Sequence, residues 1–319
     1  MTSPPQRLSE LEAALAGAGL DPGRHRALLA RVRAFFTRYA YLEKTLLGSV
    51  RVPVPRHLVE EELPPGDPLE AAEILAARER ARLGLLERET GDVMDLLDRE
   101  SLKVYRPPFP AASPLEGVFL FDPEVGPAFV ADGALDPLEV DFVLARLYGH
   151  FLLDHDPYRI QLVVSGEGNG SAVPVRANAF ASAFLVGRDR LAAYLEAAGW
   201  TGERELDHDL LEQLALYFEV GYRALLTRLL ALGYVVAERL PALLQAAADA
   251  RSPEVSPRET STVPERFRRL ALEAHARGRL DLDDLAAYLE TDAATARALA
   301  GRFTMPKDEP DGPSPGPRA

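Results

Sequence analysis

The sequence contains no cysteine, which excludes disulfide bonds, thiolate metal sites and cysteine nucleophiles together. It also lacks an apolar run close to the roughly 20 residues that a membrane-spanning helix needs. The first residues show no basic segment followed by an apolar one, the pattern of a secretory signal peptide. We therefore expect a cytoplasmic protein that does not contact a membrane.

The sequence has fewer basic than acidic residues. The 36 Lys and Arg residues face 49 Asp and Glu residues, which gives a formal net charge of −13. Such a balance argues against non-specific nucleic-acid binding by the whole chain, although a small DNA-reading module on an acidic body remains open. Hydrophobic residues at 47% and charged residues at 27% are typical of a globular protein.

Hydrophobic periodicity predicts helices on both sides of one short β-rich segment. Three runs rich in β-branched and aromatic residues, at 102–106, 117–121 and 127–131, are separated by Pro, Gly and Asp turns. A fourth apolar run, 160–164, is either strand or loop. The pattern predicts an α+β fold that is mainly α, with a small antiparallel sheet.

Composition shifts divide the chain into seven predicted parts. These are a helical pair at 1–50, a proline-rich linker at 51–67, a domain containing the sheet at 68–200, a helical segment with helix-turn-helix rhythm at 201–250, a linker at 251–263, a second such segment at 264–303, and a disordered tail at 304–319.

Asp136-Pro137 serves as a helix start and leads into the helix predicted at 141–155. This helix is apolar almost all round, which is typical of a buried helix. One polar stripe interrupts it, because Arg146, His150 and Asp154 follow at i, i+4 and i+8 and project from one face. Burying such groups without partners is costly. The stripe is therefore either part of a functional site or internally paired.

Two segments resemble the ImmA/IrrE family of zinc-peptidase-like proteins. Residues 145–154 (ARLYGHFLLD) are similar to its HExxH segment, and residues 177–181 (ANAFA) are similar to the latter half of its second motif, E-x-x-A-N-x-F-A. The resemblance implies a minimal zincin-like core, helices over a small sheet, with helical N- and C-terminal extensions. It also implies a protein partner, a transcriptional repressor or another transcription regulator.

In HExxH, two His residues four apart bind one zinc, and the Glu beside the first acts as general base. On this sequence the first His position holds Arg146 and the Glu position holds Leu147. His150 keeps the second His, and the third-ligand Glu of the family falls on Pro174. Arginine has no lone pair to give a metal. We expect no catalytic residue and no cofactor, with His150 as the sole retained ligand type.

The stripe leaves three alternatives open. In the first, His150 and Asp154 hydrogen-bond and Arg146 pairs with a carboxylate or carbonyl. In the second, His150, Asp154 and Glu167 form a rearranged zinc site of an active metallo-endopeptidase. In the third, a pocket around Arg146, His150, Asp154 and Asn178 binds an anionic ligand or a peptide carboxylate.

The C-terminal helical segments raise a DNA-binding alternative. Their would-be recognition helices are largely apolar, and Arg297 and Arg302 are the candidates for a DNA contact, in a homodimer. The first functional hypothesis is a catalytically degenerate regulatory or protein-binding module. The alternatives are an active zinc peptidase and a DNA-binding transcriptional regulator.

Overall fold

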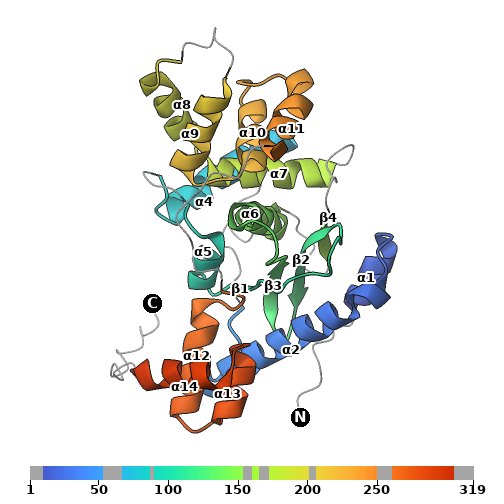
Figure 1. The fold of residues 1–319 in the computed structure, drawn as a ribbon, viewed down its shortest axis with the longest axis vertical. Helices are drawn as coiled ribbons and strands as arrows, with labels where there is room; N and C mark the ends of the chain where they lie inside the picture. Colours follow the sequence, from blue (N-terminus) through green and yellow to red (C-terminus); the bar gives the residue numbers. More distant parts are fainter. Residues whose placement is uncertain are drawn as a thin grey trace, which may run out of the picture.

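In the computed structural model, a small sheet lies in the middle of the molecule with helices on both of its faces (Figure 1). The structure describes residues 10–52, 67–86, 90–153, 160–164, 172–200, 206–249 and 261–304. Helices from the middle of the chain cover one face of the sheet. Helices from the two ends of the chain lie together on the other side.

The N-terminal helices are α1 (Leu11–Gly17) and the long α2 (Pro22–Leu47). Asp21 caps α2 by accepting a hydrogen bond from the amide of Gly23, and Pro22 occupies the first helical position, where a missing N–H costs nothing. Gly48 ends the helix with φ of 78°, a left-handed conformation that glycine adopts without strain.

Two shorter helices follow, α4 (Pro68–Arg82) and α5 (Val93–Arg99). Asp92 caps α5 through the amide of Asp95. A second carboxylate also serves this helix start, because buried Asp141 accepts a hydrogen bond of 2.9 Å from the amide of Val93. Asp141 is one of the charged residues of the predicted helix 141–155, and its buried carboxylate serves to cap the start of α5.

The sheet contains β1 (Lys103–Tyr105), β2 (Leu115–Asp122), β3 (Gly126–Ala131) and β4 (Gln161–Val164), in the spatial order β1-β3-β2-β4. β2 is antiparallel to β3 and β4, but β1 is parallel to β3, so the sheet is mixed. The prediction of an antiparallel sheet was wrong for β1. The proline-rich connection 106–114 cannot form a tight hairpin, so β3, and not β2, lies beside β1.

Both faces of the sheet are buried, and the alternation of side chains along β3 shows how. Phe129 and Ala131 belong to the hydrophobic cluster that contains the middle helices. Ala128 and Val130 belong to a second cluster, formed with the N- and C-terminal helices. Successive side chains of a strand point to opposite faces, so one strand serves two cores.

The middle helices form the larger cluster, and α6 lies directly against the sheet (Figure 1). Asp136 and Pro137 start α6, as the sequence predicted. The helices of this layer are α6 (Pro137–Leu153), α7 (Ala172–Leu185), α8 (Arg188–Ala197), α9 (His208–Phe218), α10 (Tyr222–Ala231), the 3-10 helix η2 (Ala237–Arg239) and α11 (Leu240–Asp249).

The C-terminal helices are α12 (Glu265–Ala276), α13 (Leu282–Tyr288) and α14 (Ala293–Arg302). Phe267 of α12 lies 4.6 Å, ring to ring, from Phe35 of α2, which stacks on Tyr105 of β1 at 4.2 Å. The two ends of the chain thus share one aromatic core. The mixed, mainly helical fold with helical extensions is confirmed. Within the described ranges, no helix combines the length and the apolar character needed to cross a membrane.

Candidate functional site on helix α6

Arg146 and His150 lie one turn apart on α6, and each is only 4% exposed. Two buried ionisable groups therefore share the stretch that resembles a zinc-binding motif. The third member of the predicted stripe, Asp154, lies outside the described residues, as does Glu167. Pro174 lies in the first turn of α7, where a proline is tolerated.

The carboxylate that faces Arg146 comes from the sheet. Leu115 pairs with Val164 and Gly117 pairs with Val163, so Glu116 is the extra residue of a β-bulge between them. A bulge turns a side chain away from the regular alternation. The Glu116 carboxylate lies 3.9 Å from a guanidinium nitrogen of Arg146 as a buried ion pair.

A second arginine completes the arrangement. Arg223 of α10 donates to both carboxylate oxygens of Glu116, at 2.9 and 3.0 Å. Its Nε also pairs at 2.8 Å with Glu139, from the first turn of α6, and its guanidinium stacks 5.1 Å from the ring centre of Phe142. We call Arg146, Glu116, Arg223 and Glu139 the arginine–glutamate cluster. Its two positive and two negative charges balance.

The charges of this cluster reinforce one another. Burial opposes the charge on Arg223, but the carboxylates of Glu139 and Glu116 outweigh burial and raise its pKa above the already high ordinary value. Burial raises the pKa of Glu139, and the guanidinium of Arg223 partly offsets that effect. A permanently charged guanidinium has no lone pair with which to bind a metal ion.

Close packing fixes the position of α6 against the sheet. A Cβ on Gly117 would lie 2.7 Å from a methyl group of Val143 and 3.1 Å from one of Leu147, so only glycine allows this approach. Leu147, at the general-base position, is fully buried in the larger hydrophobic cluster. An apolar side chain in the core can neither accept a proton nor orient a water molecule.

The two motif-like segments meet where α6 packs on α7. A Cβ on Gly149 would lie 2.9 Å from the ring of Phe180, which belongs to the ANAFA segment. Asn178 of α7 is partly buried, and its buried side-chain oxygen has no hydrogen-bond partner within the described part of the chain. The two segments that carry the family resemblance therefore pack against each other.

Tyr148, next to His150 on α6, belongs to a separate polar group. Its hydroxyl donates to Glu79 of α4 at 2.6 Å, and Arg82 pairs with the same carboxylate at 2.8 Å. Burial, followed by the negative charge of Glu79, raises the pKa of Tyr148 well above its ordinary value. The hydroxyl thus stays protonated and ties α6 to α4.

The residues present do not fit a catalytic zinc ion. Of the four family positions, Arg146 and Leu147 provide no ligand atom, and His150 provides the only side-chain donor type. Across the ranges that the structure describes, no three His, Asp or Glu side chains gather closely enough to hold a metal ion. The rearranged site that includes Asp154 and Glu167 involves residues outside those ranges.

The predicted DNA-contacting side chains, Arg297 and Arg302, are exposed on α14. The preceding helix starts with acidic residues, because Asp281 caps α13 and Asp283 and Asp284 fill its first turn. In helix-turn-helix proteins, nucleic acid affinity depends on positive charge facing phosphates. The helix that precedes the two arginines in the chain therefore contributes negative charge at its start.

One of the three alternatives paired Arg146 with a carboxylate or carbonyl, but the sequence did not identify Glu116, Glu139 or Arg223 as the residues of this site. Glu116 precedes a β-rich run and Arg223 lies in a largely apolar helix, so neither position carries a local motif. Only a chemical argument could have found the partner of Arg146. A buried arginine on an apolar helix requires a buried carboxylate, and Glu116 is the acid at the start of the adjacent strand.

The part of the chain that contains this cluster matches a known family model. Residues 116–230 match Peptidase_M78, described as the IrrE N-terminal-like domain. The match begins at the bulge residue Glu116 and ends in α10, so it includes the whole arginine–glutamate cluster. No curated protein matches the chain. The resemblance to the ImmA/IrrE family is thereby confirmed for this domain.

Proposed function

This chain carries an IrrE N-terminal-like domain, and from that premise we propose that the domain is a protein-binding module without peptidase activity. In this proposal it controls a transcriptional repressor or a similar regulator by binding it. The observation that carries the proposal is the arginine–glutamate cluster on α6. An arginine, paired to Glu116, stands where the first metal-binding His of the motif is expected.

Electrostatics argue against a zinc ion beside that arginine. Two like unit charges 4 Å apart repel by about 4 kcal/mol at an effective dielectric constant of 20, and a dication doubles this repulsion. Glu116 cannot offset it freely, because Arg223 already donates to both of its oxygens. Leu147 removes the general base at the same time.

The overall charge supports a protein partner with a basic surface. A net charge of −13 favours encounter with positively charged surfaces, such as those that DNA-binding regulators turn towards phosphates. We do not extend the proposal to DNA binding by this chain, because its net charge is −13 and the first turn of α13 is acidic.

Restoring the motif residues tests the proposal. We expect the triple variant Arg146→His, Leu147→Glu and Pro174→Glu to bind zinc in a calorimetric titration, because it supplies two His ligands, a third-ligand Glu and the base. The natural chain should show no specific binding. A matched control, Leu147→Glu with Pro174→Glu, keeps Arg146 and should also bind no zinc.

Two results would count against the proposal. Zinc binding by the natural chain, abolished by His150→Ala, would show that other residues complete a metal site. A folded triple variant without zinc affinity would show that these positions do not correspond to the family's ligands.

A further inference from the structure

A second buried polar group lies on the opposite side of the sheet, where α12 meets α5. Asp98 of α5 is 3% exposed and accepts a hydrogen bond of 2.6 Å from the amide of Arg266. α12 has no side-chain cap of its own, since Pro264 occupies its N-cap position. Asp98 therefore caps a helix that is distant in sequence.

The Arg266 guanidinium extends past Asp98 towards α2. Its Nη1 pairs at 2.6 Å with Glu43 and donates at 2.9 Å to the hydroxyl of Tyr39. Lys103 of β1 pairs with the other oxygen of Glu43 at 3.1 Å. We call Asp98, Arg266, Glu43, Tyr39 and Lys103 the junction cluster, because it joins α2, α5, β1 and α12.

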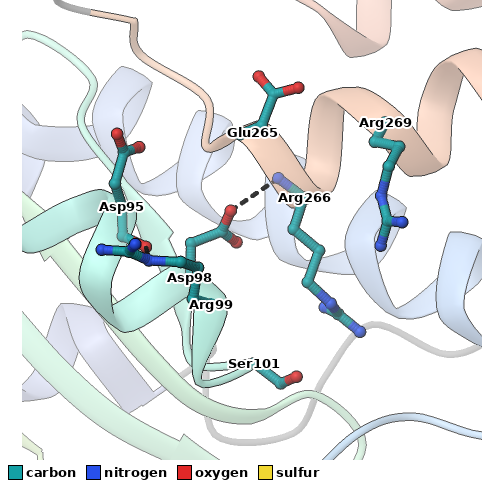
Figure 2. A pocket seen from close by; sticks show the side chains of 7 residues that line it. All are labelled: Asp95, Asp98, Arg99, Ser101, Glu265, Arg266 and Arg269. Atoms are coloured by element: carbon teal, nitrogen blue, oxygen red, sulfur yellow. Dashed lines mark hydrogen bonds between the residues drawn. The ribbon is translucent and has the colours of Figure 1, made fainter. Parts of the chain in front are cut away.

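A cavity of about 530 Å³ opens beside this cluster (Figure 2). Its size lies within the range of about 300–1,000 Å³ that is common for small-molecule sites. The lining consists entirely of polar and charged residues: Asp95, Asp98, Arg99, Ser101, Glu265, Arg266 and Arg269. Its walls come from α5, from the turn after it and from α12.

Several hydrogen-bond donors in this cavity are unused. Arg269 makes no hydrogen bond or ion pair with any described residue. Arg266 makes both of its side-chain contacts through Nη1, which leaves its Nη2 edge available. The Ser101 hydroxyl also has no partner in the described ranges, and Ser101 adopts a left-handed φ of 63° that is unfavourable for a residue with a side chain.

The acidic side chains of the cavity are either paired or directed elsewhere. Glu265 pairs with Arg268, and Asp98 is held by the start of α12. Figure 2 shows the carboxylates of Asp95 and Glu265 pointing away from Ser101, while Arg266 and Arg269 extend from α12 towards its side of the cavity. The space between the two arginines and Ser101 is therefore lined by donors.

We propose that this cavity binds a small oxyanion, a phosphate or carboxylate group, held by Arg266, Arg269 and Ser101. The two arginines are three residues apart on one helical face. Glu43 already pairs with Arg266, whereas Arg269 has no carboxylate partner among the described residues, so an oxyanion between them would offset the charge of Arg269. The start of α12 adds a partial positive charge. This site is independent of the proposed function on α6, and failure of either leaves the other intact.

Binding there would join two parts of the chain. The oxyanion would contact α12 on one side and the turn between α5 and β1 on the other. A ligand that binds only the folded state raises its stability by mass action. Occupancy would thus strengthen the attachment of the C-terminal helices to the peptidase-like domain.

Asp98 makes the binding depend on pH. Burial raises its pKa to about 6, and the hydrogen bonds and charge of Arg266 only partly offset this effect. As the pH falls from about 7 to about 5, Asp98 gains a proton and a negative charge beside the oxyanion disappears. The other charged and titratable groups of the junction are Tyr39, Glu43, Asp95, Lys103, Glu265 and Arg266.

Thermal unfolding of the full-length protein, titrated with sulfate, tests the site. Sulfate is the phosphate-like probe because it does not titrate in this range, acetate is the carboxylate probe, and sodium chloride at equal ionic strength is the control. We expect sulfate or acetate to raise the melting temperature beyond chloride at neutral pH. The sulfate effect should grow at the lower pH, where acetate itself begins to gain a proton. The more effective probe identifies the group. In the Asp98→Asn variant the pH dependence of this effect should disappear.

Variants distinguish sulfate binding in this cavity from a general effect of salt on surface charges. Arg269→Ala should weaken the apparent affinity by about tenfold, the loss of a charge-assisted hydrogen bond. Arg302→Ala should leave it unchanged, because Arg302 is exposed on α14 and neither it nor a partner of it lines the cavity. Ser101→Gly should stabilise the protein without sulfate, by relieving the left-handed strain, yet reduce the response to sulfate.

Two outcomes would overturn the proposal. In the first, chloride stabilises the protein as much as sulfate and acetate do. In the second, Arg269→Ala and Arg302→Ala lower the sulfate response equally, which is the behaviour of screened surface charge.

Discussion

The two buried ionic clusters of this protein, one on each side of the sheet, use different chemistry. The arginine–glutamate cluster on α6 pairs guanidinium groups with carboxylates, and its arginines stay charged at all physiological pH values. The junction cluster includes Asp98, with a pKa raised by burial to about 6, and Lys103, with a pKa lowered by burial to about 8. The arginines of the α6 cluster therefore keep their charge, whereas the charge of the junction cluster changes with pH near neutrality.

The two clusters also differ in what they connect. On α6, a permanently charged arginine stands where the motif resemblance implies a metal ligand, and carboxylates of β2 and α6 balance the charges of both arginines. At the junction, the buried groups join parts of the chain that are distant in sequence.

Removing Arg223 should have the strongest effect, because two buried carboxylates depend on it. In Arg223→Met, Glu139 loses its ion pair and Glu116 loses both hydrogen bonds from Arg223. We expect a loss of about 3–4 kcal/mol in the free energy of unfolding, measured in urea, as for a broken buried ion pair. The exposed Arg302→Ala should change it by less than about 0.5 kcal/mol. Equal effects of the two variants would mean that the cluster is not a coupled unit.

The junction cluster should give a stability that depends on pH near neutrality, through Asp98. The pKa of Asp98 in the folded state, about 6, lies above its ordinary value of 3.8. The folded protein therefore binds the proton more tightly, so this group raises the free energy of unfolding as the pH falls from about 7 towards 4, by up to about 3 kcal/mol. The gain is lost again as the pH rises through 6.

The difference in unfolding free energy between the natural chain and Asp98→Asn isolates that contribution. It should be largest at neutral pH, with the variant more stable, and should shrink as the pH falls. A difference that stays constant between about pH 7 and pH 4 would refute the assignment.

A smaller effect is expected from Tyr39→Phe. The hydroxyl of Tyr39 donates to Asp98 at 3.3 Å and accepts from Arg266 at 2.9 Å, and the side chain is fully buried. Its removal should cost about 1 kcal/mol in chemical denaturation and raise the pKa of Asp98 further, because a hydrogen bond to the ionised form is lost. An unchanged Asp98 titration, followed by the carboxyl carbon signal in NMR, would exclude this contact.

The sequence predicted what depends on local pattern and on recognisable motifs. The helix with Arg146 and His150, its start at Asp136-Pro137 and the strand 127–131 all follow from periodicity and turn residues. These features need no knowledge of distant contacts.

Long-range partners could not be predicted in this way. Glu116 faces α6 only because a β-bulge redirects it, and a bulge leaves no clear mark in a single sequence. The cap that Asp98 provides for α12 joins residues 168 positions apart. The parallel pairing of β1 with β3 likewise depends on where the connection 106–114 carries the chain.

The zinc content of the natural full-length protein, purified without chelators from zinc-supplemented cells, decides whether the α6 face is a metal site. With Arg146 paired to Glu116 and Leu147 in the core, we predict a zinc content far below one equivalent, unchanged by His150→Ala. One equivalent of zinc that disappears in His150→Ala would contradict the account, because His150 would then belong to a metal site that the guanidinium of Arg146 does not prevent.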